Sequence, residues 1–256
     1  MSLTGSHVAD SLQLPPEHWL DFLACQSEQT YNTRRYLFRR IGLRSGVVVE
    51  PGCGAGAALA DLLKTRPELT AIGVDIDSTV LRTAPEGIER IVAPAEKLPL
   101  ANSIADAVLF HFSLMWVNPR QALAEAFRIL KPGGHLILAG EPDYGGMLSH
   151  PDPGDKKTMV SKLRRGIARV NGDPDLGRRI GELASGAGFE VLETGMASKP
   201  QLYGKENLEE LAKLFRFRQM FHPRSAPIWE RFARKFAQHS GYLEFLPVFY
   251  LLGRKA

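Results

Sequence analysis

One segment near the start of the chain constrains the fold more than any other. Residues 47–49 are three consecutive valines, which indicate a strand buried on both faces of a sheet. Gly52, Gly54 and Gly56 follow at every second position, and glycine tolerates positive φ and has no Cβ to block a ligand. The Ala/Leu run after them predicts a helix, whose first N–H groups suit a polar ligand. The segment therefore predicts a strand, glycine loop and helix that hold a nucleotide-type ligand.

Length and cysteine content limit the class of protein. The 256 residues suffice for one large α/β domain, or for one domain with a cap. No apolar run reaches the roughly 18 residues of a membrane-spanning helix, and the polar N-terminal segment argues against a secretory signal. Cys25 and Cys53 are too far apart in the sequence to indicate a disulfide framework or a metal site. We expect a cytoplasmic protein with no metal and no membrane insertion.

The charge is mildly basic and unevenly distributed. The formal net charge is +4, which is not typical of a dedicated nucleic-acid-binding protein. Residues 156–179 nevertheless carry eight Lys and Arg residues against Asp173 and Asp175. This stretch is either a solvated helix face or a patch for an anionic substrate or RNA.

From residue 47 onward the pattern alternates between strands and helices, which is typical of a parallel sheet covered on both faces. The predicted strands are 47–50, 71–75, 90–92, 107–110, 135–139, 189–193 and 246–253, and the main helices are 56–65, 119–130 and 176–187. A helical region at 15–40 precedes them, and helices at 205–220 and 227–239 precede the final strand. We expect an N-terminal helical cap at 1–42 and a main domain at 43–256, with an insertion at 142–175 and a helical lid at 205–240.

The residues around the glycines discriminate between adenosine ligands. Gly52, Gly54 and Ala57 fit the dinucleotide fingerprint, and Asp75 ends the next strand, where a carboxylate can accept hydrogen bonds from ribose hydroxyls. Glu50 lies just ahead of the glycines, where its charge would repel a pyrophosphate. A ligand with an ammonium group and no phosphate, such as S-adenosylmethionine, is favoured over NAD. The sequence contains neither a Tyr-x-x-x-Lys pair nor a P-loop.

Three motifs together carry a family resemblance. Residues 50–56 (Glu-Pro-Gly-Cys-Gly-Ala-Gly), 73–75 (Gly-Val-Asp) and 128–134 (Arg-Ile-Leu-Lys-Pro-Gly-Gly) resemble those of the class I S-adenosylmethionine-dependent methyltransferases, within the ubiquinone/menaquinone-biosynthesis branch. The resemblance covers roughly residues 31–141 and the final two strands. It implies a doubly wound, mostly parallel, Rossmann-like α/β sheet of seven strands with an antiparallel last strand, and S-adenosyl-L-methionine as cofactor.

The resemblance also implies roles for individual residues. The backbone of the glycine loop would contact the methionine part, Glu50 its ammonium group, Asp75 the ribose and Ile76 the adenine. Pro94 stands where the family usually has Asp, so adenine recognition is expected from the Ala95 N–H or from Glu96. The implied cofactor-binding residues are Tyr31, Glu50, Gly52, Cys53, Gly54, Asp75, Ile76, Ala95, Glu96, Phe110 and His111. Arg34 resembles, as Tyr31 does, a position that reaches the cofactor carboxylate.

Candidate bases follow from position and chemistry. His111, Glu141 and Asp143 come just after predicted strands, where open α/β sheets bind ligands, and each can accept a proton. His111 is the first choice, although it could instead pack or hydrogen-bond beside the cofactor. The leading hypothesis is methyl transfer to a small-molecule acceptor. The alternatives are an RNA or protein methyltransferase that uses the basic stretch, a non-catalytic cofactor-binding protein, and the disfavoured NAD enzyme.

Overall fold

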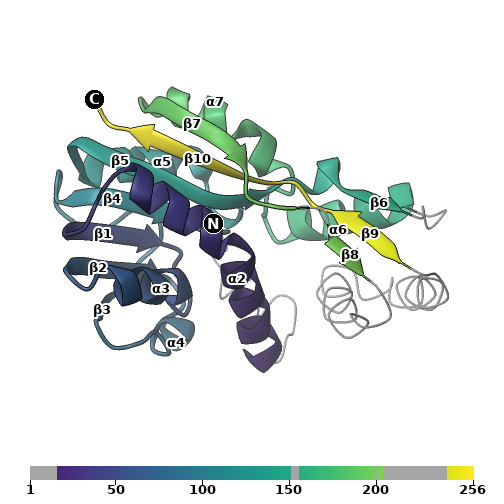
Figure 1. Ribbon diagram of the computed structural model, residues 1–256, viewed down its shortest axis with the longest axis horizontal. Coiled ribbons are helices and arrows are strands. Elements are labelled where there is room, and N and C mark those ends of the chain that lie inside the picture. Colours follow the sequence, from purple (N-terminus) through teal and green to yellow (C-terminus); the bar gives the residue numbers. More distant parts are fainter. Residues whose placement is uncertain (1–15, 151–155, 200, 204–240) are drawn as a thin grey trace.

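The structure is a computed structural model that describes residues 16–150, 156–199, 201–203 and 241–256. Its centre is a seven-stranded sheet in the order β3-β2-β1-β4-β5-β10-β7 (Figure 1). The strands are β1 (Gly46–Pro51), β2 (Leu69–Asp75), β3 (Ile88–Val92), β4 (Ala105–Phe110), β5 (Leu130–Pro142), β7 (Glu190–Met196) and β10 (Val248–Arg254). The predicted helices at 205–220 and 227–239, and with them the lid at 205–240, lie outside the described residues.

The pairing of the strands confirms the predicted topology. β1 pairs in parallel with both β2 and β4, β2 pairs in parallel with β3, and β4 pairs in parallel with β5. β10 is inserted between β5 and β7 and runs antiparallel to both. The fold is therefore a doubly wound, Rossmann-like α/β sheet with one reversed strand, as the sequence predicted.

Helices flank this sheet, and the start of α5 shows how the sequence determines a helix boundary. In α5, the Asn118 side chain accepts hydrogen bonds from the N–H groups of Arg120 and Gln121, and Pro119 occupies the first turn, where no hydrogen bond is lost. The helices, including the 3-10 turns η1 to η3, are α2 (Pro16–Arg40), α3 (Ala57–Thr65), α4 (Ser78–Leu81), η1 (Leu114–Trp116), α5 (Pro119–Ile129), η2 (Tyr144–Gly146), α6 (Lys156–Arg169), η3 (Leu176–Arg179) and α7 (Ile180–Gly186).

The sheet has a separate apolar core on each face because neighbouring residues of a strand point in opposite directions. In β1, Val48 packs with Leu37 of α2 and Leu59 of α3 on one face, whereas Val49 packs with Leu123 of α5 on the other. Thus α2 belongs to the helical layer of the sheet in the part that is described. The division into a cap at 1–42 and a main domain at 43–256 stays a prediction.

A second sheet was not predicted. It has three antiparallel strands in the order β6-β9-β8, formed by β6 (Leu148–His150), β9 (Tyr242–Phe245) and β8 (Gln201–Tyr203). It extends the molecule beyond the end of β10, beside α6 (Figure 1). Strands of three or four residues from distant segments carry too few alternating positions to show a period of two, so the sequence gives no signal for them.

Candidate functional site

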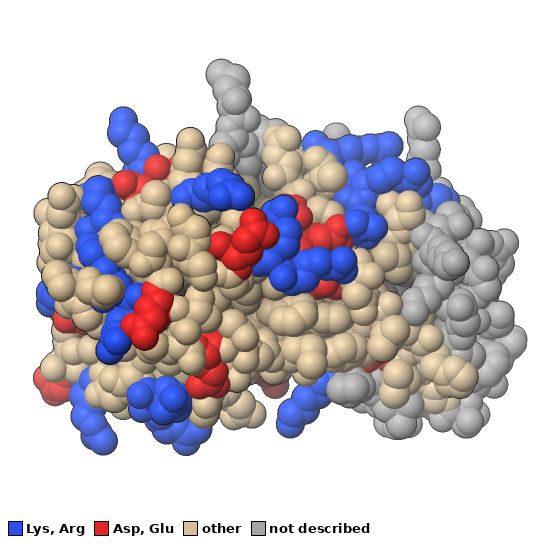
Figure 2. All heavy atoms as spheres, turned by 90° about the horizontal axis from the view of Figure 1, so that it is seen from above, with Lys and Arg blue, Asp and Glu red and all other residues tan. Residues whose placement is uncertain are grey.

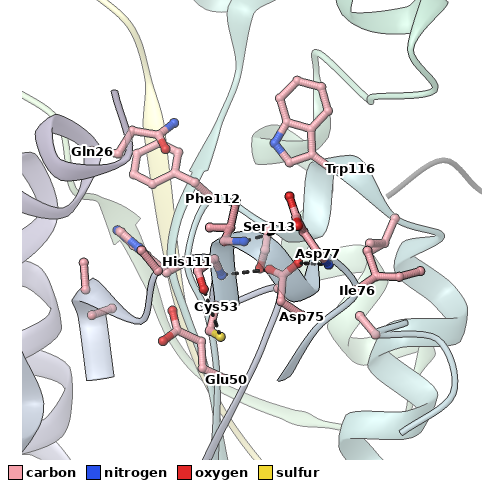
Figure 3. A pocket seen from close by; sticks show the side chains of 18 of the residues that line it. Gln26, Glu50, Cys53, Asp75, Ile76, Asp77, His111, Phe112, Ser113 and Trp116 are labelled. Carbon is pink, nitrogen blue, oxygen red and sulfur yellow. Dashed lines mark hydrogen bonds between the residues drawn. The ribbon is translucent and has the colours of Figure 1, made fainter. Parts of the chain in front are cut away.

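A pocket opens at the carboxyl ends of β1, β2 and β4, which meet at one edge of the sheet (Figure 3). Eight of the residues predicted to bind the cofactor line it: Glu50, Gly52, Cys53, Gly54, Asp75, Ile76, Ala95 and His111. The sequence analysis missed a further set on the pocket wall, which includes Gln26, Ser27, Asp77, Phe112, Ser113 and Trp116. Gln26 and Ser27 lie in a helix that carries no sequence motif. Residues 112–116 carry no motif either, and only their position directly after β4 could have indicated a role in the site.

The glycine loop has the backbone that its sequence predicts. Gly52, Gly54 and Gly56 have φ values of 72°, 53° and 72°, which other residues rarely adopt. The N–H groups of Gly52 and Cys53 both donate to the carbonyl oxygen of Val74, at 2.7 and 3.1 Å. A Cβ on Gly52 would lie 2.6 Å from the Cβ of Ser113, so glycine is required there for space as well as for φ.

Asp75 is held by the backbone on both sides of the pocket. Its Oδ2 accepts a hydrogen bond from the Gly54 N–H at 2.8 Å, and its Oδ1 accepts one from the Asp77 N–H at 2.9 Å. The side chain is buried, and burial raises its pKa while these two N–H groups favour the charged form. Each carboxylate oxygen has a second lone pair, so Asp75 can still accept hydrogen bonds from a ligand.

Glu50 is the most unusual group in the pocket. Its side chain is 2% exposed, and its Oε2 has no hydrogen-bond partner among the described residues. Burial raises its pKa to about 8, and the charge of Asp75 acts in the same direction, whereas the charge of Arg34 and the Leu59 N–H oppose the shift. A buried carboxyl oxygen without a partner is costly, so this position is suited to a cationic or hydrogen-bond-donating ligand.

His111 contacts α2 through one ring nitrogen. Its Nε2 lies 2.7 Å from Thr30 Oγ1 and 3.2 Å from Arg34 Nη1. The ring also packs edge-on against Phe112, with the ring centroids 5.0 Å apart. Burial and the charge of Arg34 lower the pKa of His111 well below its usual value. His111 is therefore uncharged at neutral pH.

The structure does not place three predicted cofactor ligands in the pocket. Tyr31 lies beside Arg35 in a shallow cleft between α2 and α3, and Phe110 is fully buried in the core. Glu96 points toward α5, where its Oε1 accepts a hydrogen bond from the Asn118 N–H at 2.9 Å. Adjacent residues of a strand face opposite ways, so Phe110 points into the core while the neighbouring His111 lines the pocket. The roles of Tyr31, Phe110 and Glu96 at the cofactor stay predictions.

Glu141, a predicted base, does not line the pocket either. It is fully buried behind η1, where its Oε1 accepts a hydrogen bond from the Leu114 N–H at 3.2 Å. Burial raises its pKa to about 8, and the N–H groups of residues 113–115 oppose that shift. The residue braces the loop that forms one pocket wall. Its role as a base stays a prediction, and in this structure the carboxyl group is enclosed.

Asp143 has a structural partner instead of a place in the pocket. Its two carboxylate oxygens accept hydrogen bonds from Nε and Nη2 of Arg178, both at 2.7 Å. Nearby, the Gly145 N–H donates to Asp175 Oδ1 at 3.0 Å, and the Asp173 N–H donates to the Met115 carbonyl oxygen at 2.8 Å. The segment after β5 and the segment before η3 thus form one interlocked unit that supports η1.

The basic stretch at 156–179 is partly neutralised. Arg164, Arg178 and Arg179 form ion pairs with Asp175, Asp143 and Asp173 respectively. Figure 2 shows red side chains among the blue ones near the middle of the face it presents, and a group of blue side chains beside the grey residues. These contacts favour the interpretation of the stretch as a solvated helix face over that of an RNA-binding patch.

Comparison with known proteins identifies the domain. Residues 49–138 match the methyltransferase domain family. This chain carries a class I methyltransferase domain. Among curated proteins, it is 31% identical over 119 residues to malonyl-[acyl-carrier protein] O-methyltransferase of Dechloromonas aromatica and 34% identical over 102 residues to the ubiquinone/menaquinone biosynthesis C-methyltransferase UbiE of Syntrophotalea carbinolica. The matches cover 43% and 37% of this chain, but only 45% and 43% of those relatives. The chain thus spans less than half of their length.

Solved structures share the methyltransferase fold over most of the chain. A methyltransferase from Bacillus halodurans aligns with a TM-score of 0.57 and 17% identity, over 87% of this chain and 98% of its own. Geranyl diphosphate C-methyltransferase from Streptomyces coelicolor, solved with S-adenosyl-L-homocysteine, aligns with a TM-score of 0.56 and 12% identity, over 88% and 79% of the two chains. In the described part of this methyltransferase domain, no helix is both long and apolar enough to cross a membrane. The same part contains no group of three or more His, Cys, Asp or Glu residues arranged to hold a metal ion.

Proposed function

We propose that this protein transfers a methyl group from S-adenosylmethionine to a small-molecule acceptor. One observation carries the proposal: the buried, unpartnered Glu50 Oε2 faces the glycine loop in a pocket at the carboxyl ends of the parallel strands. A nicotinamide dinucleotide would bring a pyrophosphate to this carboxyl group. S-adenosylmethionine brings an ammonium group and no phosphate.

The residues present fit the cofactor. Glu50 would accept a hydrogen bond from the ammonium group, and the positive-φ glycines leave the backbone of residues 52–54 open toward the methionine part. Asp75 would accept hydrogen bonds from the ribose hydroxyls while Gly54 and Asp77 hold its carboxylate in place. Ile76 and Ala95 would contact the adenine, with Pro94 beside them on the same wall.

The chemistry requires little from the protein beyond orientation and a dry site. S-adenosylmethionine supplies an activated methyl group on a sulfonium, so the enzyme mainly positions the donor against the acceptor. His111, Phe112 and Trp116 line the same pocket and would border the space for the acceptor. His111 is uncharged, so the proton of an acceptor group can pass to it only where its Nδ1 is accessible and unprotonated.

Calorimetric titration of the purified protein tests the proposal. We expect S-adenosylmethionine to bind with a micromolar Kd and NADH not to bind. The Asp75→Ala variant should bind S-adenosylmethionine about 10- to 100-fold more weakly, because a charge-assisted hydrogen bond contributes about 1.5–3 kcal/mol. Glu89→Ala, an exposed acidic residue on the neighbouring strand β3, is the matched control and should bind normally. Absence of binding at millimolar S-adenosylmethionine would refute the proposal.

The acceptor is proposed only as a class. The two curated relatives carry names that refer to different acceptors, a malonyl-[acyl-carrier protein] and a quinone precursor, and the segments of this chain that would select an acceptor include residues outside the described part. A screen of small-molecule carboxylates, phenols and amines for methylation with labelled donor would identify it. A cytoplasmic location stays a prediction.

A further inference from the structure

We propose that Arg34 is a positioning residue: its guanidinium fixes the orientation of the His111 ring and thereby holds α2 in place as a wall of the pocket. The importance of Arg34 for methyl transfer rests on the proposed function, but the contact between Arg34 and His111 can be tested without it. Arg34 does not line the pocket itself, although two of the residues it contacts, Ser27 and His111, do.

Arg34 is a buried cation with an unusually complete set of partners. Its side chain is 5% exposed, and Nη2 donates both to Asp61 Oδ2 of α3 and to Ser27 Oγ, each at 3.0 Å. Nη1 donates to the Ser27 carbonyl oxygen and to Thr30 Oγ1, each at 2.8 Å. A planar guanidinium can serve so many acceptors at once, whereas the ammonium of lysine cannot span them.

These contacts fix the segment of α2 that reaches the pocket. Ser27 and its neighbour Gln26 both line the pocket, and Arg34 is bonded to the main chain and the side chain of Ser27. Asp61 belongs to α3, the helix that follows the glycine loop. Arg34 thus joins α2 to the helix whose first residues form the opposite side of the ligand cradle.

The same guanidinium determines which form of His111 is present. Its Nη1 lies 3.2 Å from His111 Nε2, and a guanidinium carries only donors. Both hydrogens of Nη1 are donated to Ser27 and Thr30, and the Thr30 hydroxyl donates its own hydrogen to the Gln26 carbonyl oxygen at 3.1 Å. Thr30 Oγ1, 2.7 Å from Nε2, therefore accepts a hydrogen bond from an N–H on Nε2. The geometry assigns the ring proton to Nε2, which points toward α2, and leaves the lone pair on Nδ1.

The charged groups around this contact come from three elements. Arg34 lies on α2, Asp61 on α3 and Glu50 on β1, and both carboxylates interact with the guanidinium. Removal of Arg34 would take away the cation beside His111 and leave the carboxylate of Asp61 without its buried partner. The pKa of His111 would then rise, with the second ring proton on Nδ1.

Nuclear magnetic resonance of the full chain, labelled with ¹⁵N in histidine, tests the assignment without any ligand. The His111→Gln spectrum identifies the His111 signals among those of the seven histidines. In the wild-type protein we expect the shifts of the Nε2-protonated form and no titration near pH 6.5. In Arg34→Met we expect a mixture of the two neutral forms and a titration moved toward pH 6.5.

Two further variants make the test decisive. Arg34→Lys keeps a charge for Asp61 and should fold, but it should also show the mixed His111 signals and bind S-adenosylmethionine about tenfold more weakly. Arg35→Met, the exposed neighbour on α2 that contacts Tyr31, should match the wild type in both measurements. An Nδ1-protonated His111 in the wild type, or unchanged His111 signals in folded Arg34→Lys, would overturn the proposal. If the wild type binds no S-adenosylmethionine, the proposed function fails while the assignment of Arg34 is still decided by the spectra.

Discussion

The guanidinium of Arg178 donates two hydrogen bonds to the carboxylate of Asp143, with both N–O distances at 2.7 Å. Asp143 is 6% exposed, whereas Arg178 is half exposed, so the pair lies where the interlocked unit meets solvent. We expect Arg178→Met to lower the free energy of unfolding by about 1–3 kcal/mol, because it leaves a buried carboxylate without its main partner. Urea denaturation measures this value. Arg165→Met, at an exposed position of α6, should change it by less than about 0.5 kcal/mol. Similar values for the two variants would contradict the structural role of the pair.

Glu141 should make the stability of the protein depend on pH. Its pKa in the folded state is about 8, above the usual 4.5, so the folded protein binds a proton that the unfolded chain releases. The contribution of Glu141 to the free energy of unfolding is therefore at its full value below pH 4.5. It falls as the pH rises toward 8, by up to about 1.4 kcal/mol per pH unit. Glu141→Gln mimics the protonated form, so its stability relative to the wild type should increase steadily from pH 5 to pH 8.

Thermal or urea unfolding across that range provides the measurement. Glu125→Gln is the control, because Arg128 lowers the pKa of Glu125 and the residue is ionised in both folded and unfolded states above pH 5. Its stability relative to the wild type should therefore be constant over the same range. A flat difference for Glu141→Gln as well would show that Glu141 is ionised in the folded protein.

Binding of the donor should release a proton from Glu50. At pH 7 the free protein holds Glu50 mostly protonated, since burial raises its pKa to about 8 against the opposing charge of Arg34. An ammonium group beside the carboxyl would lower that pKa, so the affinity for S-adenosylmethionine should rise between pH 6 and pH 7.5, by up to tenfold per pH unit. Calorimetry in two buffers of different ionisation enthalpy should detect about one proton released. Glu50→Gln should bind more weakly at pH 7.5 and release none; the same proton release in that variant would assign it to another group.

Gly52 and Gly42 form a matched pair for testing the glycine loop. Both have positive φ, 72° and 65°, but an added Cβ would meet Ser113 at 2.6 Å at Gly52 and nothing within 4 Å at Gly42. Both Ala variants should therefore incur the backbone cost of about 1–2 kcal/mol, and only Gly52→Ala should incur a further clash. We expect Gly52→Ala to be the less stable by at least 1 kcal/mol in urea denaturation and to bind the donor poorly. Equal free energies of unfolding for the two variants would show that residues 113–117 move away from the added Cβ without loss of stability.

The sequence predicted the main sheet well because its signals are local. The valines of β1, the glycines after them and the Asn118-Pro119 start of α5 each determine the conformation of their own few residues. The reversed β10 followed from the family resemblance rather than from any local signal. The strand ends were predicted too short, most clearly in β5, which extends from Leu130 to Pro142 because Gly133 and Gly134 continue the strand and exchange hydrogen bonds with Lys255.

The site was predicted only in part because side-chain direction depends on packing. Glu50 and Asp75 lie at the carboxyl ends of buried strands in a fixed register, and both line the pocket. Glu141 and Asp143 also follow a strand, but they turn toward η1 and Arg178, which are partners far along the chain. The family resemblance indicated a contribution of α2 through Tyr31 and Arg34, but no pattern in residues 26–34 reveals that they meet His111.

The position of β10 affects how the protein can fold during synthesis. β7 touches no other strand of the main sheet than β10, and β10 lies more than fifty residues further along the chain. After β7 has emerged from the ribosome, the whole intervening stretch must therefore be translated before β7 can join the sheet. Meanwhile β5 exposes an unpaired edge, which is a template for wrong strand pairing. Slowing translation across the intervening stretch would lengthen that vulnerable interval and increase aggregation of nascent chains.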